Sequence, residues 1–569
     1  MAAPIFFHIS PEWCGDARLV RLFRRNGHCA AMGENGDLAA RILLAEAEGR
    51  VPFSGRDDIR LFAGLWRNDP FWQPPLEAWR RFAFLARTVP QAHFILTTRA
   101  LDGWLLDRLT RDRGAVARCH AYHRGIPEAD LPDLWRAEWN AHLAAVQDFF
   151  GDDPRLIRVD LDRESPHDLI DRLRPLISMP HKPVPLHWIA PPRAMRDDDL
   201  LAALDRVRAP AAIDPDYVRD VAGFCLRGRA PGKGAVAGLS GYACLWDGGA
   251  RVLDPAGAPR RIRVAGSVAV SQPGRHFKLL RAEAVINDAL RLGRRSPLSI
   301  DMEDSRWLGS DDGAAPGRPV LGHCRREGAR NMVLWPLPGQ HDVGLPGFDP
   351  AAPADPIAFE DKEDRLVWRG MISGSEMRDT VRPGPASHVF LRQLAAAQDD
   401  ADARQEAFGG LCRTSRMAFV RRFWDHPDFD LGVVMAWGYR EFAADPLIAP
   451  YCVPRRKPGF FRRFRYQLCL TGYDHGSNFI PMIDSRSVLL KEEDGWEVFY
   501  SGRFKPWKHY IPVARYCADI EEKLAWARDN PRECKAMSAA ARTECARLRD
   551  LPTRRAIMAA ILDGLGEAR

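Results

Sequence analysis

Apolar runs and glycine turns alternate in the last third of the chain. The runs YQLCLTG at 466–472 and SRSVLLKE at 485–492 are mostly apolar and predict two buried strands. Between them, Gly476, Ser477 and Asn478 offer turn and N-cap chemistry for a short helix that begins directly afterwards. A strand, a glycine turn and a helix N-terminus in this order direct backbone N–H groups towards a bound anion. The segment therefore predicts a phosphate-binding site.

Two earlier strands end in polar residues of the same kind. DRLVWRGMISG at 364–374 predicts a strand that runs into a glycine turn, with Arg369 near its end. PLSIDMED at 297–304 predicts a strand that ends in Asp301 and Asp304, at the edge where α/β folds bind ligands. Two strand-turn sites in separate halves predict two Rossmann-like domains that face one another across a cleft.

The first 185 residues also alternate between predicted strands and helices. IFFHIS at 5–10, FILTTR at 94–99 and RLIRVDL at 155–161 predict strands. LWRAEWNAHLAAVQDFF at 134–150 carries apolar and aromatic residues at helical spacing. This part of the chain therefore predicts an α/β domain of its own.

The pattern changes beyond a proline-rich and charged stretch at 186–210, which predicts a linker. ARVLD at 250–254 and RIRVAGSVAV at 261–270 predict strands of a meander, and residues 276–293 predict an amphipathic helix. Good helix formers at amphipathic spacing fill 519–565 and predict a helical tail.

Composition and charge exclude several classes of protein. A chain of 569 residues is too long for one core, and 46% hydrophobic with 28% charged residues is typical of a soluble globular protein. The net charge of +7 is too small to indicate a nucleic-acid partner, so we expect none.

The cysteines and the apolar runs bear on the compartment. The twelve cysteines are spread singly without a Cys-x-x-Cys pair, which favours reduced thiols. The first twenty residues lack the features of a signal peptide, and no apolar run reaches the length of a membrane span, so we expect a cytoplasmic protein. The basic and phenylalanine-rich segment 454–465 would suit peripheral contact with the inner membrane, although we favour a solvated loop.

The order of motifs in the first 185 residues, HIS, LVRLFRRNGH, FILTTRALDGWLLDRL and PRLIRVDL, resembles the bacterial sulfotransferase family. The resemblance implies a P-loop-like α/β fold whose first loop, Pro-Lys-x-Gly-Thr-Thr, binds the phosphates of the sulfate donor. Here that loop is EWCGDA at 12–17, so Trp13 replaces the lysine and Asp16 adds negative charge. Arg99 matches the family arginine at the 3′-phosphate, but its serine partner is Asp107. We therefore expect a degenerate domain kept for packing or partner binding.

A second set of motifs over about 211–560 resembles glycosyltransferase family 90. The motifs are LSIDMED, RPVLGH, NMVLWP, LVWRG, YQLCLTG, SVLLKEEDGWE and FKPWKHYIPV, in that order. That family includes eukaryotic protein O-glucosyltransferases, capsule xylosyltransferases and bacterial lipopolysaccharide core glycosyltransferases. The resemblance implies a GT-B fold, a UDP-sugar donor and inversion at the anomeric carbon.

The same resemblance implies roles for particular residues. Asp304 takes the position of the general base, and Trp335, Lys505 and His509 fall in the cleft. The positions implied in donor binding are Arg369, Gly370, Met371, Ser373, Arg416, Gly472, Tyr473, Asp474, His475, Gly476, Ser477, Asn478 and Glu497. Asn478 stands where eukaryotic members carry an arginine at the pyrophosphate, so we expect Arg369 or Arg416 to supply that charge. Each of these residues also has a plainer interpretation in packing, capping or ion pairing.

The chemistry of inverting transfer is consistent with this set. A carboxylate can take the proton of the attacking hydroxyl, and N–H dipoles or arginines can stabilise the departing diphosphate. No Asp-x-Asp motif ends a suitable strand, and the acidic run at 301–304 is the nearest substitute. We therefore expect no cofactor or metal besides the UDP-sugar co-substrate.

The prediction as a whole is an α/β protein with a sulfotransferase-type P-loop-like domain followed by a GT-B-like pair. The expected parts are a domain at 1–185, a linker at 186–210, two glycosyltransferase halves at 211–355 and 356–545, and a helix at 546–569. We expect it to transfer a glucose- or xylose-type sugar to a saccharide or lipid-linked saccharide during synthesis of lipopolysaccharide, capsule or another bacterial surface polysaccharide. Two alternatives remain open: a bifunctional enzyme that also transfers sulfate, and a non-catalytic carbohydrate-binding scaffold.

Overall fold

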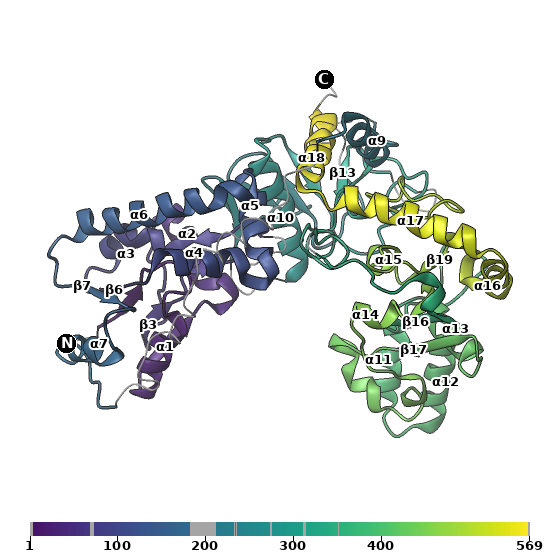
Figure 1. Cartoon of the computed structure of the whole chain (residues 1–569), viewed down its shortest axis with the longest axis horizontal. Coiled ribbons are helices and arrows are strands. Elements are labelled where there is room, and N and C mark those ends of the chain that lie inside the picture. Colours follow the sequence, from purple (N-terminus) through teal and green to yellow (C-terminus); the bar gives the residue numbers. More distant parts are fainter. Residues whose placement is uncertain are drawn as a thin grey trace. The chain divides into compact units, whose positions relative to one another are not determined.

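The computed structural model of the chain describes residues 4–566, except 69–72, 182–211, 231, 233, 235, 273–275, 311–314 and 351. The predicted linker at 186–210 lies outside the described residues. The chain divides into two compact units, which Figure 1 shows in sequence colours. The N-terminal unit comprises Met1–Pro210 and Tyr242–Leu298, and the C-terminal unit comprises Ala211–Gly241 and Ser299–Arg569.

The N-terminal unit is built on a parallel sheet of five strands in the order β2-β3-β1-β6-β7. Successive residues of β1 point to opposite faces, so Phe6 and Leu61 join one apolar core while Phe7, Phe62 and Phe94 join another. The strands are β1 (Phe6–His8), β2 (Cys29–Met32), β3 (Ile59–Ala63), β6 (His93–Thr98) and β7 (Leu156–Asp160). The helices are α1 (Asp16–Arg25), α2 (Asp37–Glu48), α3 (Phe82–Thr88), α4 (Leu101–Thr110), α5 (Ala115–Arg124), α6 (Leu131–Phe150) and α7 (Pro166–Leu173). The strands and the long helix predicted in this segment are confirmed.

An antiparallel meander and a helix from 242–298 belong to the same unit. The meander comprises β8 (Cys244–Trp246), β9 (Arg251–Leu253), β10 (Pro259–Ala265) and β11 (Val268–Ser271), and α10 (Phe277–Arg291) follows it. Glu283 on α10 accepts hydrogen bonds from Ser271 N, from Gln73 Nε2 and from Arg67 Nη2, which lies 3.2 Å away. Arg67 belongs to β4 (Trp66–Arg67), which pairs antiparallel with β5 (Leu76–Glu77), and Gln73 lies between these two strands. This buried ion pair joins the meander to the first α/β domain, whereas the sequence pattern had grouped 242–298 with the glycosyltransferase half.

The C-terminal unit contains a second parallel sheet of five strands, in the order β17-β16-β18-β19-β21. Apolar residues at the centres of its strands, such as Leu366, Leu468 and Leu490, are buried in one core, as expected for a sheet covered by helices. They are β16 (Glu363–Gly370), β17 (Phe429–Val433), β18 (Phe464–Cys469), β19 (Val488–Glu492) and β21 (Ile511–Val513). The predicted strands at 364–374, 466–472 and 485–492 are confirmed.

Shorter strands precede this sheet in the same unit. The strands β12 (Leu298–Ile300), β13 (Val320–Gly322) and β15 (Met332–Leu334) run parallel, while β14 (Cys324–Arg326) pairs antiparallel with β20 (Trp496–Val498). The helices of the unit are α9 (Pro215–Leu226), α11 (Ser387–Ala397), α12 (Ala401–Cys412), α13 (Ser415–Phe423), α14 (Pro458–Phe461), α15 (Phe479–Ile483), α16 (Ile520–Asp529), α17 (Pro531–Leu548) and α18 (Leu551–Gly566). The unit is therefore mixed α/β with Rossmann-like parallel strands.

The last helix lies beside the first helix of the C-terminal unit. Figure 1 shows α18, in yellow, next to α9. A Cβ at Gly564 would lie 2.4 Å from Leu226 Cδ1, so the close approach of these helices depends on that glycine. Arg554 on α18 donates hydrogen bonds to the carbonyls of His341 and Leu548, at 2.6 Å each. Across the described part of the chain, no helix is both long and apolar enough to cross a membrane.

Candidate active site

A small cavity of about 40 Å³ lies at the carboxyl ends of the parallel strands of the C-terminal unit. This is the edge at which open α/β sheets bind their ligands. Loops that follow β16, β18, β19 and β21 supply most of its walls. The lining residues are Trp307, Arg326, Ser375, Val381, Pro383, Ser415, Thr471, Gly472, Tyr473, Glu492, Asp494, Trp496, Arg515 and Tyr516.

The turn after β18 forms one wall of this cavity and is fixed by hydrogen bonds on both sides. The Tyr473 hydroxyl hydrogen-bonds with Ser387 Oγ at 3.0 Å, with Tyr439 Oη at 2.9 Å and with His388 Nδ1 at 3.3 Å. These contacts hold the turn against α11 and against the 3₁₀ segment at 437–444. Helix α15 begins at Phe479, directly after Asn478, as predicted.

Arg416 lies behind the turn and binds the protein's own backbone. Its guanidinium donates to the carbonyls of Met371, Leu470 and Thr471 and to Ser373 Oγ, at 2.6–3.0 Å. The side chain therefore joins the loop after β16 to the loop after β18. A Cβ at Gly472 would lie 3.1 Å from Arg416 Nη2, so the absence of a side chain at Gly472 leaves room for the guanidinium.

Two carboxylates after β19 form the floor of the cavity. Glu492 accepts hydrogen bonds from the N–H groups of Thr471 and Tyr516, at 3.0 and 2.7 Å, and Asp494 accepts one from Thr471 Oγ1 at 2.6 Å. Burial and the nearby Asp494 raise the pKa of Glu492. Neither acid is among the site residues predicted from the sequence. In α/β folds, acids at the carboxyl end of a strand lie near ligands, and this rule led to Asp304. The same rule applies to Glu492 and Asp494.

Asp304 follows β12, and its loop is hydrogen-bonded to the turn after β18. Ser305 N donates to Asp474 Oδ2 at 2.9 Å, and Ser305 Oγ donates to the Tyr473 carbonyl at 2.8 Å. His323 Nε2 lies 3.5 Å from Asp474 Oδ2 and 3.9 Å from Asp304 Oδ1. Burial alone would raise the pKa of Asp474, but His323 and the Ser305 N–H lower it below its usual value. The Asp304 side chain is 41% exposed, so its carboxylate can be reached from solvent.

Asp301, the other acid at this strand end, is engaged inside the unit. It is fully buried and accepts hydrogen bonds from Ser240 N and Ser240 Oγ, at 2.8 and 2.7 Å. Arg306 Nε lies 3.1 Å from its carboxylate. Of these two aspartates, Asp304 is the one whose side chain is exposed to solvent.

Several predicted site residues make contacts within the fold and lie outside the lining of the cavity. Arg369 pairs with Asp430 at 2.7 Å and stacks on Phe460. Glu497 pairs with Arg325 at 2.9 Å across the β14–β20 pair and also with Arg227.

The remaining predicted positions are distributed between packing and surface. Trp335 and His509 are buried, and His509 Nδ1 accepts a hydrogen bond from Lys505 N at 2.8 Å. The His475 Nε2 hydrogen-bonds with Tyr500 Oη at 3.2 Å, and burial lowers the pKa of His475 to about 4. Gly370 is the last residue of β16, and a Cβ at Gly476 would lie 2.6 Å from Cys469 Sγ. The Asn478 side chain donates a hydrogen bond to Met482 Sδ, and Ser477 is exposed.

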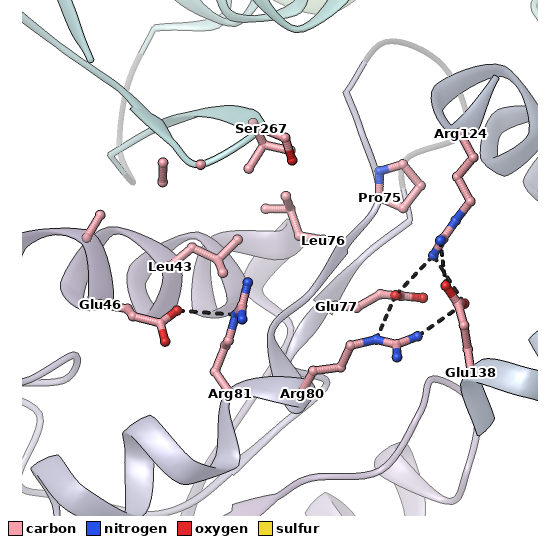
Figure 2. A pocket seen from close by; sticks show the side chains of 14 residues that line it. Leu43, Glu46, Pro75, Leu76, Glu77, Arg80, Arg81, Arg124, Glu138 and Ser267 are labelled. Carbon is pink, nitrogen blue, oxygen red and sulfur yellow. Dashed lines mark hydrogen bonds and ion pairs between the residues drawn. The ribbon is translucent and has the colours of Figure 1, made fainter. Parts of the chain in front are cut away.

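A larger cavity, of about 740 Å³, lies in the N-terminal unit (Figure 2). Its polar lining is a network of ion pairs between Arg80, Arg81 and Arg124 and three glutamates, with separations of 2.5–3.3 Å. The glutamates are Glu46, Glu77 and Glu138. Burial alone would raise the pKa of Glu77, but Arg80 and the other arginines hold this pKa at about 2. The charges of this lining are therefore balanced, which does not favour a phosphate ligand.

The loop at 12–17 in the same unit is filled by its own side chains. Asp16 Oδ1 accepts from Gly64 N at 3.2 Å and lies 3.2 Å from His8 Nδ1. Trp13 packs edge-on against Trp66, and Arg111 stacks on its ring. Trp13 and Asp16 are therefore both engaged by other residues of the N-terminal unit.

The C-terminal unit belongs to the class of mixed α/β folds, with loops gathered around a cavity at the carboxyl edge of a parallel sheet. Residues 458–546, which supply β18, β19, β20, β21 and the loops between them, match the family model described as glycosyl transferase family 90. The similarity to this family therefore lies within the C-terminal unit.

Similar proteins agree with this assignment. Human protein O-glucosyltransferase 3 is 29% identical over 223 residues, which is 36% of this chain and 39% of that protein. Mouse protein O-glucosyltransferase 3 is 33% identical over 79 residues, 14% of this chain and 16% of that protein. The uncharacterized protein 027R of Frog virus 3 is 29% identical over 113 residues, 19% of this chain and 11% of that protein. The chain thus matches less than two fifths of the length of each of these relatives.

Proposed function

We propose that the chain is an inverting glycosyltransferase that moves a glucose- or xylose-type sugar from a UDP-sugar to a hydroxyl group of a saccharide or lipid-linked saccharide. The position of Asp304 carries the proposal: its carboxylate is solvent-accessible, and Ser305 ties its loop to the turn after β18. The family 90 match supports sugar transfer. The similarity to protein O-glucosyltransferases supports a donor of glucose type.

In this mechanism Asp304 accepts the proton of the acceptor hydroxyl as that oxygen attacks the anomeric carbon. Negative charge then grows on the departing diphosphate, which needs N–H dipoles or cations nearby. Arg326 and Arg515 line the cavity and can supply that charge. Arg416, which binds four oxygen atoms of its own unit, positions the turn that holds the donor.

The proposed role is synthesis of a bacterial surface polysaccharide in the cytoplasm, with peripheral membrane contact through 454–465. Residues 454–459 are exposed and strongly basic, which suits an anionic surface. Phe464 is buried and Phe460 carries the guanidiniums of Arg369 and Arg456 on its ring, so these aromatics serve packing. Contact through this segment would therefore be electrostatic and sensitive to salt.

The test is transfer and donor binding by the full chain and by Asp304→Asn. We expect the variant to bind UDP as the wild type does and to lose at least about a hundredfold in kcat, since a positioned base contributes about 10²–10⁴-fold. Asp425→Asn, an exposed aspartate of the same unit, is the control and should keep full activity. Transfer that persists in Asp304→Asn would exclude this base. A wild-type protein that binds saccharide but transfers from no UDP-sugar would favour the carbohydrate-binding scaffold.

The identity of the donor can be screened by thermal stabilisation with UDP, GDP, CMP and 3′-phosphoadenosine 5′-phosphate. A nucleotide at about a hundred times its Kd adds about 2.7 kcal/mol to the unit that binds it. We expect UDP to stabilise the C-terminal unit. Stabilisation of the N-terminal unit by the adenosine nucleotide would instead support the bifunctional enzyme, despite the contacts of Trp13 and Asp16.

A further inference from the structure

Within the described part of the chain, three side chains of different chemistry converge beside Asp304. His323, Cys324 and Asp474 each offer one ligand atom, and these atoms lie within 4.8 Å of one another. His323 and Cys324 lie at the junction of β13 and β14, and Asp474 comes from the turn after β18. From this geometry we propose that they form a binding site for a zinc-type divalent cation, whether or not the chain transfers sugars.

The separations match the edges of a tetrahedral site. Zinc binds nitrogen and oxygen at about 2.0–2.2 Å and sulfur at about 2.3 Å, so neighbouring ligand atoms are about 3.3–3.6 Å apart. His323 Nε2 lies 3.5 Å from Asp474 Oδ2, and Cys324 Sγ lies 3.6 Å from the same oxygen. Two of the three distances between the ligand atoms are therefore close to those in a tetrahedral zinc site.

The hydrogen bonding around His323 leaves the imidazole poorly satisfied without a cation. Its Nε2, the nitrogen that would bind the cation, lies 3.5 Å from Asp474 Oδ2, beyond an ordinary hydrogen bond. A buried ring nitrogen without a good partner costs stability. A cation bound to Nε2 would give the imidazole a strong partner.

The backbone around the three residues is held in place before any ion binds. Cys324 pairs with Val498 in the β14–β20 ladder, and Ser305 N fixes the Asp474 carboxylate. His323 and Cys324 are 4% and 1% exposed. A site that is already ordered loses little entropy when it binds an ion.

The donor set selects the type of ion. Thiolate and imidazole ligands suit zinc and related transition metals, whereas magnesium and calcium prefer oxygen atoms alone. Three protein ligands leave a fourth position open, and Asp304 Oδ1 lies 3.9 Å from His323 Nε2. The ion would therefore lie next to the proposed base and fix the relative positions of the two loops.

The test is cobalt binding by the full chain after removal of metals with EDTA. Cobalt(II) replaces zinc in tetrahedral sites and shows sulfur coordination as a thiolate-to-metal charge-transfer band. We expect one cobalt per chain, with this band, and displacement by zinc. Cys324→Ser should lose the band, and His323→Gln should weaken binding at least about tenfold. Cys469→Ser is the control, because Cys469 is a buried thiol of the same unit that donates to Asn478 Oδ1 and lies outside the cluster.

The outcomes separate this site from the proposed sugar transfer. No stoichiometric cobalt binding, or a charge-transfer band that persists in Cys324→Ser, would overturn the site. If Cys324→Ser does not fold, X-ray absorption of the zinc-loaded wild type decides, since one sulfur near 2.3 Å is required. UDP binding is measured on the metal-free protein. The result for UDP binding is therefore independent of the result for cobalt binding.

Discussion

The backbone N–H of Ser305 donates a 2.9 Å hydrogen bond to the carboxylate of Asp474, 169 residues further along the chain. This bond joins the loop of the proposed base to the turn that lines the cavity. Asp474→Ala should therefore lower kcat for sugar transfer at least about tenfold, because small displacements of a reacting group are costly. Ser305→Ala keeps its N–H and loses only the hydroxyl contact with Tyr473, so its kcat should stay within about fivefold of the wild type. Equal losses in both variants would argue against this role for the bond.

Arg416 gives a prediction that separates a structural role from contact with the donor. Arg416→Ala removes the guanidinium that donates to the Met371, Leu470 and Thr471 carbonyls. The free energy of unfolding of the C-terminal unit should therefore fall by about 2–4 kcal/mol. Denaturant unfolding measures this change. Arg413→Ala is the matched control, because its pair with Glu376 is exposed and should contribute less than about 1 kcal/mol. A stably folded Arg416→Ala with reduced UDP affinity would instead place this guanidinium on the donor.

Glu283 tests whether 242–298 folds with the N-terminal unit. Glu283→Ala leaves the buried Arg67 without its carboxylate, which should destabilise that unit by about 3–5 kcal/mol. In calorimetry, the unfolding temperature of the N-terminal unit should fall, and that of the C-terminal unit should stay the same. Glu48→Ala, which removes a surface pair with Arg50, should shift neither transition by a comparable amount. A shift confined to the C-terminal unit would contradict the division.

Two buried histidines predict loss of stability in mild acid. Burial lowers the pKa of His142 in the N-terminal unit and of His475 in the C-terminal unit to about 4, from a usual value of 6.5. Between these values the unfolded chain binds a proton that the folded unit does not, so stability falls as the pH drops from about 6.5 to 4, by up to about 3 kcal/mol per histidine. Denaturant unfolding at pH 7.5, 6 and 5 measures the slope. His142→Gln should flatten it in the N-terminal unit alone, and an unchanged slope would assign the effect to other groups.

The sequence was informative where a pattern is local. The apolar runs of β16, β18 and β19, and the start of α15 after Asn478, follow from residues that are neighbours in the chain. The acid at the end of β12 was found by the same local rule.

The structural role of Arg416 could not be read in the same way. Its backbone partners lie 45 to 55 residues away, and an arginine gives no local sign of which carbonyls it will meet. The partners of Glu283, Arg67 and Gln73, are more than 200 residues away, so the grouping of the meander with the first domain was also out of reach.

The packing of α18 against α9 also bears on how the protein is made. Helix α9 ends at Leu226 and buries Tyr217, Val218, Val221 and Cys225, while its partner α18 ends at Gly566. At about 5–20 residues per second, a ribosome would take roughly 15 to 70 s between these two helices. The N-terminal unit is complete once Leu298 has emerged, whereas the contacts between α9 and α18 form only after Gly566 has been synthesised. The packing of α9 is therefore completed long after the N-terminal unit can fold.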